Sequence, residues 1–449
     1  MEINMDIIKN VTMYILGFEP YVMLPFIILI LAMIFRIKLS TAIKSSFTIG
    51  IGFIGIFVIF DYFVTIINPV IQKLISRAGL QLDILDAGWP PLAAITWAFS
   101  LAPLLLVILI LLNIILLITK LTKTVNIDIW NYWHFIFAGA LVYNISSSVF
   151  LSILASITTF IITIKLADWS APMLHKFSGL KGISVPTLSA VAYFPFGVLG
   201  NKLIDYIPFV NKINANPEKI KEKMGLIGEP MIIGFILGVL LGIGAGCDIR
   251  QIAEFAFGIA AVIYILPKMA NIVGTSLIPI SEGMKDFIKK HFPKTKKTYI
   301  GLDVAVIIGL PSVVVTSILL IPVSLALAFI LPGVRFIPLG DLVNLVVIAS
   351  LLCVATKGNV VRSFLIGIPI VILHLYLASN MAYLYTRLAG SVNFSLADYD
   401  GIFTSFLDGG NALRVWTVET FSGNIYAFLL LPVVVGVLYL TRKFSSKNN

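Results

Sequence analysis

Apolar runs long enough to cross a lipid bilayer recur along almost the whole chain. A helix needs about 20 consecutive apolar residues to span the hydrocarbon core, and eleven runs meet that requirement. We place them at approximately 18–36, 46–69, 95–119, 130–146, 148–167, 229–246, 252–273, 303–331, 339–356, 361–386 and 424–441. A polar break at 144–148 favours two helices there over one long helix through 128–169. Only 12% of the residues are charged, against about 25% in soluble domains, so the chain is predicted to be an all-α polytopic membrane protein.

The basic residues of the chain, whose net charge is +10, gather in short loops between these runs. The clusters lie at 36–44, 120–123, 212–223, 285–297, 357–362 and 442–447. Cytoplasmic loops of membrane proteins are enriched in Lys and Arg. Eleven spans with the amino terminus outside place every cluster, and the carboxyl terminus, on the cytoplasmic side. The charge is therefore explained by the bilayer, and we expect no nucleic acid partner.

Polar motifs recur at a nearly constant separation of about 213 positions. The pairs, 210 to 215 positions apart, are Glu19 with Glu229, Gly88 with Gly301, Asp128 with Asp341, and Asn144 with Asn359. An internal duplication of this kind is typical of secondary-transporter folds. Each half contains five spans, an odd number, so the second half would enter the membrane upside down. We therefore predict two inverted five-helix repeats.

Two further apolar segments, 182–200 and 401–416, are too short or too rich in Gly and Pro to be ordinary spans. Interrupted segments at matching places in two halves indicate a binding site, because irregular backbone at membrane depth must be buried or line a wet cavity. We predict a re-entrant hairpin in each. The domains are then a first repeat (1–201), an amphipathic cytoplasmic linker (202–227), a second repeat (228–416), and a last span with a cytoplasmic tail (417–449).

Polar residues beside or within apolar runs are the candidate substrate contacts, because an ionisable group in the membrane costs a few kcal/mol. Trp89 would offer an apolar face to a sugar or polyol, and Asp86 would accept hydroxyl hydrogens; Asp303 holds the equivalent place in the second half. A Trp anchor and prolines that merely start a span would explain the same motif, so that alternative stays open.

Asp128 and His134 belong to the densest polar and aromatic cluster, residues 126–134, and their spacing lets them share a helical face. Asp341 occupies the matching place in the second half. We expect the four acids to converge near the two hairpins, where Thr187 and Asp408 add a hydroxyl and a carboxylate. These groups suit an uncharged polyhydroxylated solute. A proton- or sodium-coupled carrier would use a similar set, and Asp408 could also simply form a tight turn.

The sequence lacks the motifs that mark several other classes of protein. The chain has no P-loop of an ATPase, no intramembrane hydrolase signature and no selectivity-filter repeat. Its two cysteines and four histidines are too scattered to indicate a disulfide framework or a metal site. We expect no metal and no cofactor.

At these motifs the chain resembles the membrane subunit, enzyme IIC, of the bacterial sugar phosphotransferase system, in its galactitol branch within the ascorbate/galactitol superfamily. The segments that carry the resemblance are ILDAGWP at 84–90, VNIDIWNYWH at 125–134, GEP at 228–230, IGLD at 300–303 and PLGDL at 338–342. The family's first hairpin tends to carry a His after its proline, whereas this chain has Thr187 after Pro186. That departure leaves the identity of the polyol in doubt, but not the class of transporter.

The resemblance implies a homodimer in the bacterial inner (plasma) membrane that moves a sugar alcohol, galactitol or a related polyol, by an elevator-type movement. A separate cytoplasmic IIB subunit, phosphorylated on cysteine and supplied by IIA, would phosphorylate the substrate, so the chain would not be an enzyme by itself. Two alternatives stay open: an ion-coupled secondary transporter of a polar solute, and a membrane receptor without transport.

Overall fold

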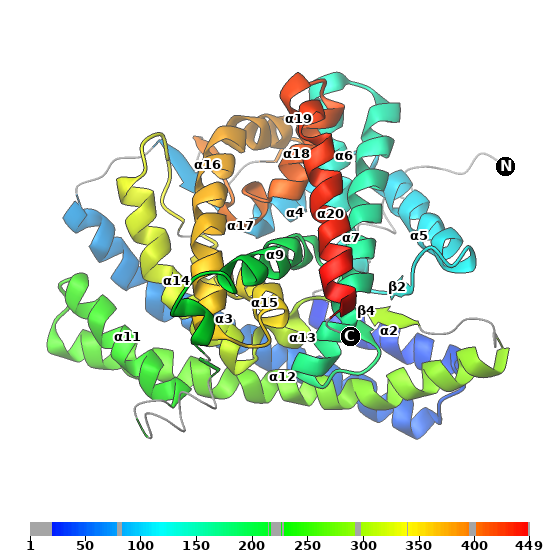
Figure 1. Cartoon of the computed structure of the whole chain (residues 1–449), viewed down its shortest axis with the longest axis horizontal. Coiled ribbons are helices and arrows are strands. Elements are labelled where there is room, and N and C mark those ends of the chain that lie inside the picture. Colours follow the sequence, from blue (N-terminus) through cyan, green and yellow to red (C-terminus); the bar gives the residue numbers. More distant parts are fainter. Residues whose placement is uncertain are drawn as a thin grey trace.

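The structure is a computed structural model that describes residues 20–78, 83–213, 215–216, 226, 229–291, 298–338, 340–394 and 401–447. It is mainly helical (Figure 1). The helices of the first half are α2 (Pro20–Ile34), α3 (Leu39–Ala78), α4 (Trp89–Ala98), α5 (Ala102–Ile118), α6 (Tyr132–Ser146), α7 (Val149–Ser178), α8 (Leu188–Val191) and α9 (Phe194–Ile204). Those of the second half are α11 (Pro230–Gly244), α12 (Ile249–His291), α13 (Ala305–Ile308), α14 (Pro311–Ile330), α15 (Leu345–Ala355), α16 (Val360–Ser391), α17 (Phe406–Gly409), α18 (Ala412–Phe421), α19 (Ile425–Leu429) and α20 (Leu431–Lys447).

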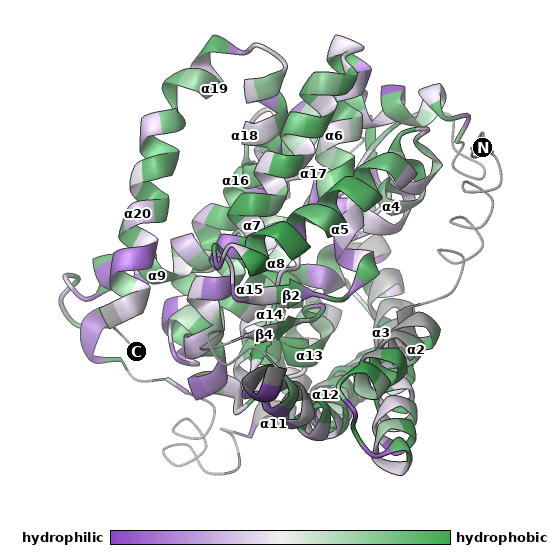
Figure 2. Cartoon of the chain, turned by 90° about the vertical axis from the view of Figure 1, so that its right-hand side faces the viewer, coloured by the Kyte–Doolittle hydropathy of each residue, from purple (hydrophilic) through white to green (hydrophobic). Residues whose placement is uncertain are grey.

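Several of these helices are suited to a membrane. Within the described residues, α7, α14, α16 and the stretch 425–446 are long and apolar enough to cross a bilayer, and α4 with α5 would make a fifth span if the bent pair is counted as one. Apolar residues cover most helix faces, and hydrophilic residues concentrate toward helix ends and loops (Figure 2). The expected helical membrane protein is thus confirmed in its class.

One expected span, 95–119, is not a single straight helix. It consists of α4 and α5, which meet at 96°. Pro103 stands in the first turn of α5, where a missing N–H costs nothing, whereas the same residue inside a continuous helix would break a hydrogen bond. The expected run 303–331 is likewise divided, because Pro311 begins α14 after the one-turn α13.

The polar breaks, in contrast, separate helices as expected. Helix α6 ends at Ser146 and α7 begins at Val149. The Ser148 side chain caps α7 by accepting a hydrogen bond from the Leu151 N–H at 3.3 Å. Asn359 caps α16 in the same way through the Arg362 N–H at 3.1 Å.

Five short strands among the described residues correct the expectation of an all-α chain. They are β1 (Ile84–Asp86), β2 (Thr124–Asn126), β3 (Ile183–Ser184), β4 (Tyr299–Gly301) and β5 (Ile402–Thr404). One parallel sheet pairs β1 with β5, and a second has the order β2-β4-β3. Backbone groups of irregular segments in apolar surroundings need hydrogen-bond partners, and these strands supply them. Each sheet joins a segment of the first half to one of the second.

Helices α2, α3, α11 and α12, which we call the scaffold unit, pack mainly on one another. Helix α12 runs at a steep angle to α7, α16 and α20 (Figure 1). The backbones approach closely: a Cβ added at Gly238 would lie 2.6 Å from the Ala256 Cα, and one at Gly52 would lie 2.6 Å from the Val273 side chain. Small residues at such crossings are typical of helix packing in membranes.

Two expected domain boundaries fall inside helices. The boundary after residue 201 lies within α9, and the one after residue 416 lies within α18. Helix α18 continues to Phe421 because neither Gly nor Pro stands between Ala412 and Gly423, whose φ is 87°. Of the expected linker 202–227, positions 214, 217–225 and 227 lie outside the described residues, as does Glu19.

Candidate functional site

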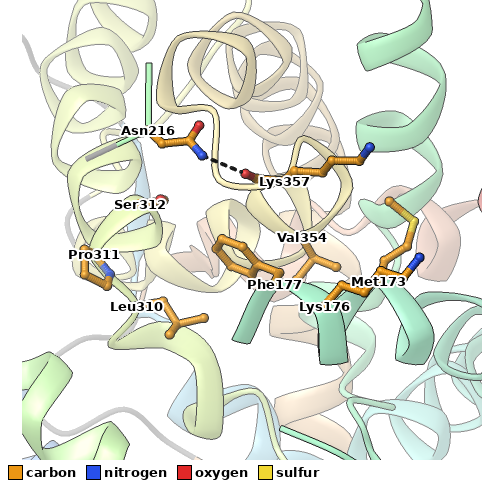
Figure 3. Close-up of a pocket in the computed structure, with 9 residues that line it drawn as sticks. All are labelled: Met173, Lys176, Phe177, Asn216, Leu310, Pro311, Ser312, Val354 and Lys357. Carbon is orange, nitrogen blue, oxygen red and sulfur yellow. Dashed lines mark hydrogen bonds between the residues drawn. The ribbon is translucent and has the colours of Figure 1, made fainter. Parts of the chain in front are cut away.

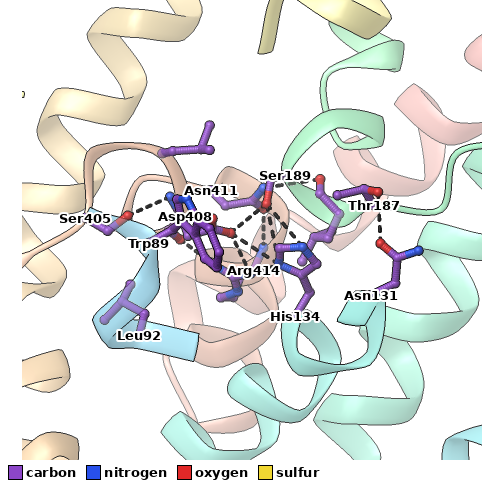
Figure 4. A network of polar contacts seen from close by, with 12 residues as sticks. Trp89, Leu92, Asn131, His134, Thr187, Ser189, Ser405, Asp408, Asn411 and Arg414 are labelled. Carbon is purple, nitrogen blue, oxygen red and sulfur yellow. Dashed lines mark hydrogen bonds and ion pairs between the residues drawn. The ribbon is translucent and has the colours of Figure 1, made fainter. Parts of the chain in front are cut away.

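The two segments expected to be hairpins meet each other at their tips. Each consists of a strand, a one-turn helix and a longer helix: β3, α8 and α9 in the first, and β5, α17 and α18 in the second. The Ser189 hydroxyl at α8 donates to Asp408 Oδ1 at 2.7 Å. The Asn411 amide donates to the Leu188 carbonyl oxygen at 3.4 Å. The site is built around this contact (Figure 4).

A buried ion pair occupies the contact between the tips. The Arg414 guanidinium, which is 0% exposed, places Nη2 at 3.0 Å from Asp408 Oδ1. His134 Nδ1, on α6, lies 3.3 Å from the same oxygen. Removing a charge from water costs several kcal/mol unless it is paired and hydrogen-bonded, so this cluster is a costly feature that the fold retains. Asp408 Oδ2 accepts no hydrogen bond within the described part of the chain.

Aromatic rings border the ion pair. The Arg414 guanidinium lies 5.4 Å from the Trp133 ring centroid and 5.0 Å from that of Phe137, within the range of cation–π attraction. Trp89 stacks on Trp133 with centroids 6.3 Å apart and an angle of 28° between the rings. Trp89 is only partly buried. The apolar face expected from Trp89 therefore lies beside the charged centre.

Asp86 and Asp341 form the first of two acid groups. The Asp341 N–H donates to Asp86 Oδ2 at 3.1 Å, and the Phe406 N–H donates to Asp86 Oδ1 at 2.9 Å. Asp341 in turn accepts from the N–H groups of Trp89 and Leu407, each at 3.1 Å. The two carboxylates therefore join the start of α17, in the second half, to the segment 86–89 of the first half. Their oxygens already accept hydrogen bonds from protein donors.

Asp303 and Asp128 form the second group, at the base of the first hairpin. The Thr187 hydroxyl lies 3.0 Å from Asp303 Oδ2 and 2.9 Å from the Asn131 amide oxygen. The Val304 N–H donates back to the Thr187 hydroxyl at 2.9 Å. Asp128 accepts from the Trp130 N–H at 3.0 Å. Ser405, at the matching place of the second hairpin, donates its hydroxyl to Asp341.

The four acids thus converge near the hairpins, but not as one site. Asp86 pairs with Asp341 and Asp128 lies near Asp303, so each group joins one acid of each half. The physical reason is the strand pairing, because β1 lies against β5 whereas β4 lies between β2 and β3.

Arg414, which lies at the centre of the cluster, is not among the site residues predicted from the sequence. The available signal was its position, since it is a lone basic residue inside the apolar segment 401–416, where an ionisable group indicates function by default. Tyr193 and His374 were also missed; their rings lie 5.1 Å apart.

Two polar atoms near the tips, His374 Nε2 and Arg414 Nε, are buried without a hydrogen-bond partner in the described part of the protein. Buried polar groups in folded proteins are nearly always satisfied. A hydroxyl-rich solute is one kind of ligand that could supply the missing partners. No group of three or more His, Cys, Asp or Glu side chains among the described residues is arranged to hold a metal ion.

Comparison with known proteins identifies one family over most of the chain. Residues 14–400 match the family of the PTS system sugar-specific permease component. A putative permease IIC component of Escherichia coli (strain K12) is 34% identical over 435 residues, which cover 96% of this chain and 98% of the relative. The PTS system galactitol-specific EIIC component of the same strain is 32% identical over 437 residues, or 97% of this chain and 95% of the relative.

Proposed function

The chain belongs to the sugar-specific permease family of phosphotransferase systems, and from this premise we propose that it carries a sugar alcohol, galactitol or a close relative, across the bacterial plasma membrane. The family makes it a transport component of a phosphotransferase system. The observation that carries the proposed substrate class is the meeting of the two hairpin tips, where charged, hydroxyl and aromatic groups surround the Asp408–Arg414 pair.

A neutral polyol suits the composition of this centre. Asp408 and Arg414 cancel each other's charge, so the site needs no charged ligand. Asp408 Oδ2 can accept a hydroxyl hydrogen, whereas Arg414 Nε can donate to a hydroxyl oxygen. The indole rings of Trp89 and Trp133 offer apolar surface to the carbon chain. We assign direct contact to Asp408, Arg414, His134 and Trp89.

The remaining candidates would act by holding the hairpins in place. The carboxylates of Asp86 and Asp341 bind backbone N–H groups of α17, and Asp303 binds Thr187 at the start of α8. Asp128 lies near Asp303 at the base of the first hairpin. Precise substrate geometry depends on such supporting hydrogen bonds.

The order of the elements supports two repeats. Helices α2 and α11 each contain 15 residues, and each precedes a helix of 40 residues or more. After these, both halves contain a short strand, a bent or divided helix, two further helices and a hairpin segment. We propose that the halves are inverted relative to each other.

The proposed topology agrees with contacts between loops. Arg362, in the first turn of α16, binds Asp205, just after α9, at 2.7 Å, and both belong to regions expected to be cytoplasmic. Arg387 donates to the Asn144 carbonyl oxygen at 2.9 Å, and both lie at ends expected to be outside. Arg335 pairs with Asp83, also outside, and its guanidinium holds the pKa of the Asp83 carboxyl below its ordinary value. These contacts support the proposed grouping of segments on each side of the membrane. The orientation itself, with an outside amino terminus and a cytoplasmic carboxyl terminus, is proposed from the basic clusters.

Transport would follow an elevator movement of the hairpin-bearing helices against a homodimeric scaffold unit. A separate IIB subunit, supplied by IIA, would then phosphorylate the polyol at the cytoplasmic face. Cys353 is 0% exposed within the helix bundle, which is unsuited to a phosphoryl carrier that must reach a cytoplasmic donor.

Uptake measurements separate this function from ion-coupled transport. Cells that express the chain with IIA and IIB should accumulate labelled polyol as its phosphate, and a protonophore should leave uptake unchanged. Uptake that requires the ion gradient and proceeds without phosphoenolpyruvate would instead establish the ion-coupled alternative. A panel of labelled hexitols and pentitols, bound to the purified protein, would identify the substrate.

A further inference from the structure

His374, on α16, lies against the tip of the second hairpin and carries a buried nitrogen without a partner. The residue is 0% exposed, and its Nδ1 lies 2.8 Å from the Phe406 carbonyl oxygen at the start of α17. A carbonyl oxygen only accepts hydrogen bonds, so Nδ1 carries the hydrogen, and in the neutral ring Nε2 keeps a lone pair. Nε2 accepts no hydrogen bond in the described part of the protein.

The imidazole ring contacts both hairpin segments. Its centroid lies 5.4 Å from that of Phe406, in the second hairpin, and 5.1 Å from that of Tyr193, in the first. The backbone of the second tip also approaches closely, because a Cβ added at Gly410 would lie 2.7 Å from His374 Nδ1. Phe406 and Gly410 stand on either side of Asp408 in the sequence. His374 therefore packs directly against the turn that carries the acid of the buried ion pair.

A purely structural contact with this turn does not require Nε2. Tyr385, also on α16 and fully buried, holds the same turn through one group, because its hydroxyl donates to the Gly409 carbonyl oxygen at 2.7 Å. The bond to Phe406 explains Nδ1 of His374 in the same way. It leaves Nε2 unexplained, and a buried acceptor without a partner costs free energy. Because buried polar atoms nearly always have a partner, this lone pair points to a ligand.

The cavity in Figure 3 does not supply that partner. It has a volume of about 470 Å³ and lies where the ends of α7, α14 and α15 meet (Figure 3). His374 is not among the nine residues that line it, so water in this cavity does not reach Nε2. The hairpin tips, which the ring does contact, are where the polyol is proposed to bind.

We propose that His374 is a specificity-determining residue whose Nε2 accepts a hydrogen bond from one hydroxyl of the polyol. The inference rests on the proposed function, since it needs a polyol at the hairpin contact. A site built to bind a ligand hydroxyl discriminates against an analogue that lacks it, because the buried group of the protein is then left unpaired. The bond from Nδ1 to Phe406 fixes the tautomer and the orientation of the ring, and so the place of the acceptor.

Calorimetric titration of the full-length protein in detergent tests this contact. The probes are the hexitol that the wild type binds most tightly and its analogues that each lack one hydroxyl. With the wild type, one analogue should bind about tenfold more weakly than the parent hexitol, because Nε2 stays unpaired. Two variants remove that acceptor: His374→Asn keeps a donor for Phe406, and His374→Phe keeps the ring. In each of them, the same analogue and the parent hexitol should bind equally, and either variant alone decides the test.

Tyr385→Phe is the matched control, because it removes the other donor from α16 to the same turn. It should weaken the binding of all probes by one common factor, so that the ratios between them stay as in the wild type. Wild-type ratios in the His374 variants would show that His374 only holds the turn, and would overturn the proposal. Wild-type protein that binds no hexitol would instead refute the proposed function, and this contact with it.

Discussion

Arg414 and Asp408 form a buried ion pair for which we propose a role in polyol binding as well as in the fold. The pair lies 3.0 Å apart with both side chains almost fully buried. A buried ion pair replaced by apolar residues of similar size is often no less stable, whereas loss of one partner leaves an uncompensated charge. The fold alone therefore does not require these two charges, and the role that we propose for them is contact with the polyol.

We expect Arg414→Met and Asp408→Leu each to lower the free energy of unfolding by about 3–5 kcal/mol, seen as a lower midpoint of thermal unfolding. The double variant should recover most of that loss because no charge remains unpaired. It should nevertheless bind no polyol, since the acceptor and the donors at the hairpin tips are gone. A double variant that takes up polyol like the wild type would show that the pair is only structural.

His134 is predicted to act at the same centre. It lies 3.3 Å from Asp408 and 3.0 Å from Arg414 Nη2, so His134→Ala removes a polar neighbour of both charges. Uptake should fall at least tenfold, roughly the loss of one hydrogen bond to a charged group, with unchanged protein in the membrane. The control is His175→Ala, at an exposed position in the last turn of α7; equal uptake in both variants would remove His134 from the site.

At the scale of elements, the hairpins depend on acids that bind backbone N–H groups. The start of α17 donates to Asp86 through Phe406 and to Asp341 through Leu407. An asparagine in place of either acid keeps only one acceptor oxygen and turns an amide N–H₂ toward existing donors. The acids therefore determine where the tip of the second hairpin lies relative to the first.

Asp86→Asn and Asp341→Asn should each lower the free energy of unfolding by about 1–3 kcal/mol, the cost of a buried donor without a partner. Because the tip is displaced, weaker polyol binding should accompany the loss of stability. Asp83→Asn is the control: it breaks the exposed pair with Arg335, and exposed pairs contribute at most about 1 kcal/mol. Thermal unfolding and hexitol titration of the three variants check this. If Asp86→Asn behaves like the control, Asp86 does not hold the hairpin tip in position.

Some elements could be predicted from the sequence because a local residue pattern marks them, and others could not. The helix boundaries near Ser148 and Asn359 were predictable because a polar break and a capping residue mark them. The 96° bend between α4 and α5 was not, since the apolar run continues across it and only Pro103 marks the new helix. Strands of two or three residues are too short to show a period of two, and the pairing of acids across halves depends on those strands.

At the scale of the whole molecule, we propose that the scaffold unit forms the contact between the two subunits of a homodimer. Helices α3 and α12 pack along each other, and large apolar side chains remain exposed on both, including Phe47 and Phe257, each 67% exposed. The proposed polyol contacts lie outside this unit, on the second hairpin, α4 and α6. A fixed dimer of scaffold units would leave the hairpin-bearing helices able to move.

Cross-linking in the membrane tests this arrangement. In a chain whose own cysteines are replaced (Cys247→Ser, Cys353→Ala), we expect Phe257→Cys, on α12, to form a covalent dimer with a short bifunctional reagent. Phe428→Cys, on α19 and 49% exposed, is the control and should remain monomeric, because that helix lies outside the scaffold unit. Uptake by the cross-linked Phe257→Cys dimer should persist, since an elevator moves only the hairpin-bearing helices. Dimers linked through Phe428, or loss of uptake on linking Phe257, would place the moving part and the interface elsewhere.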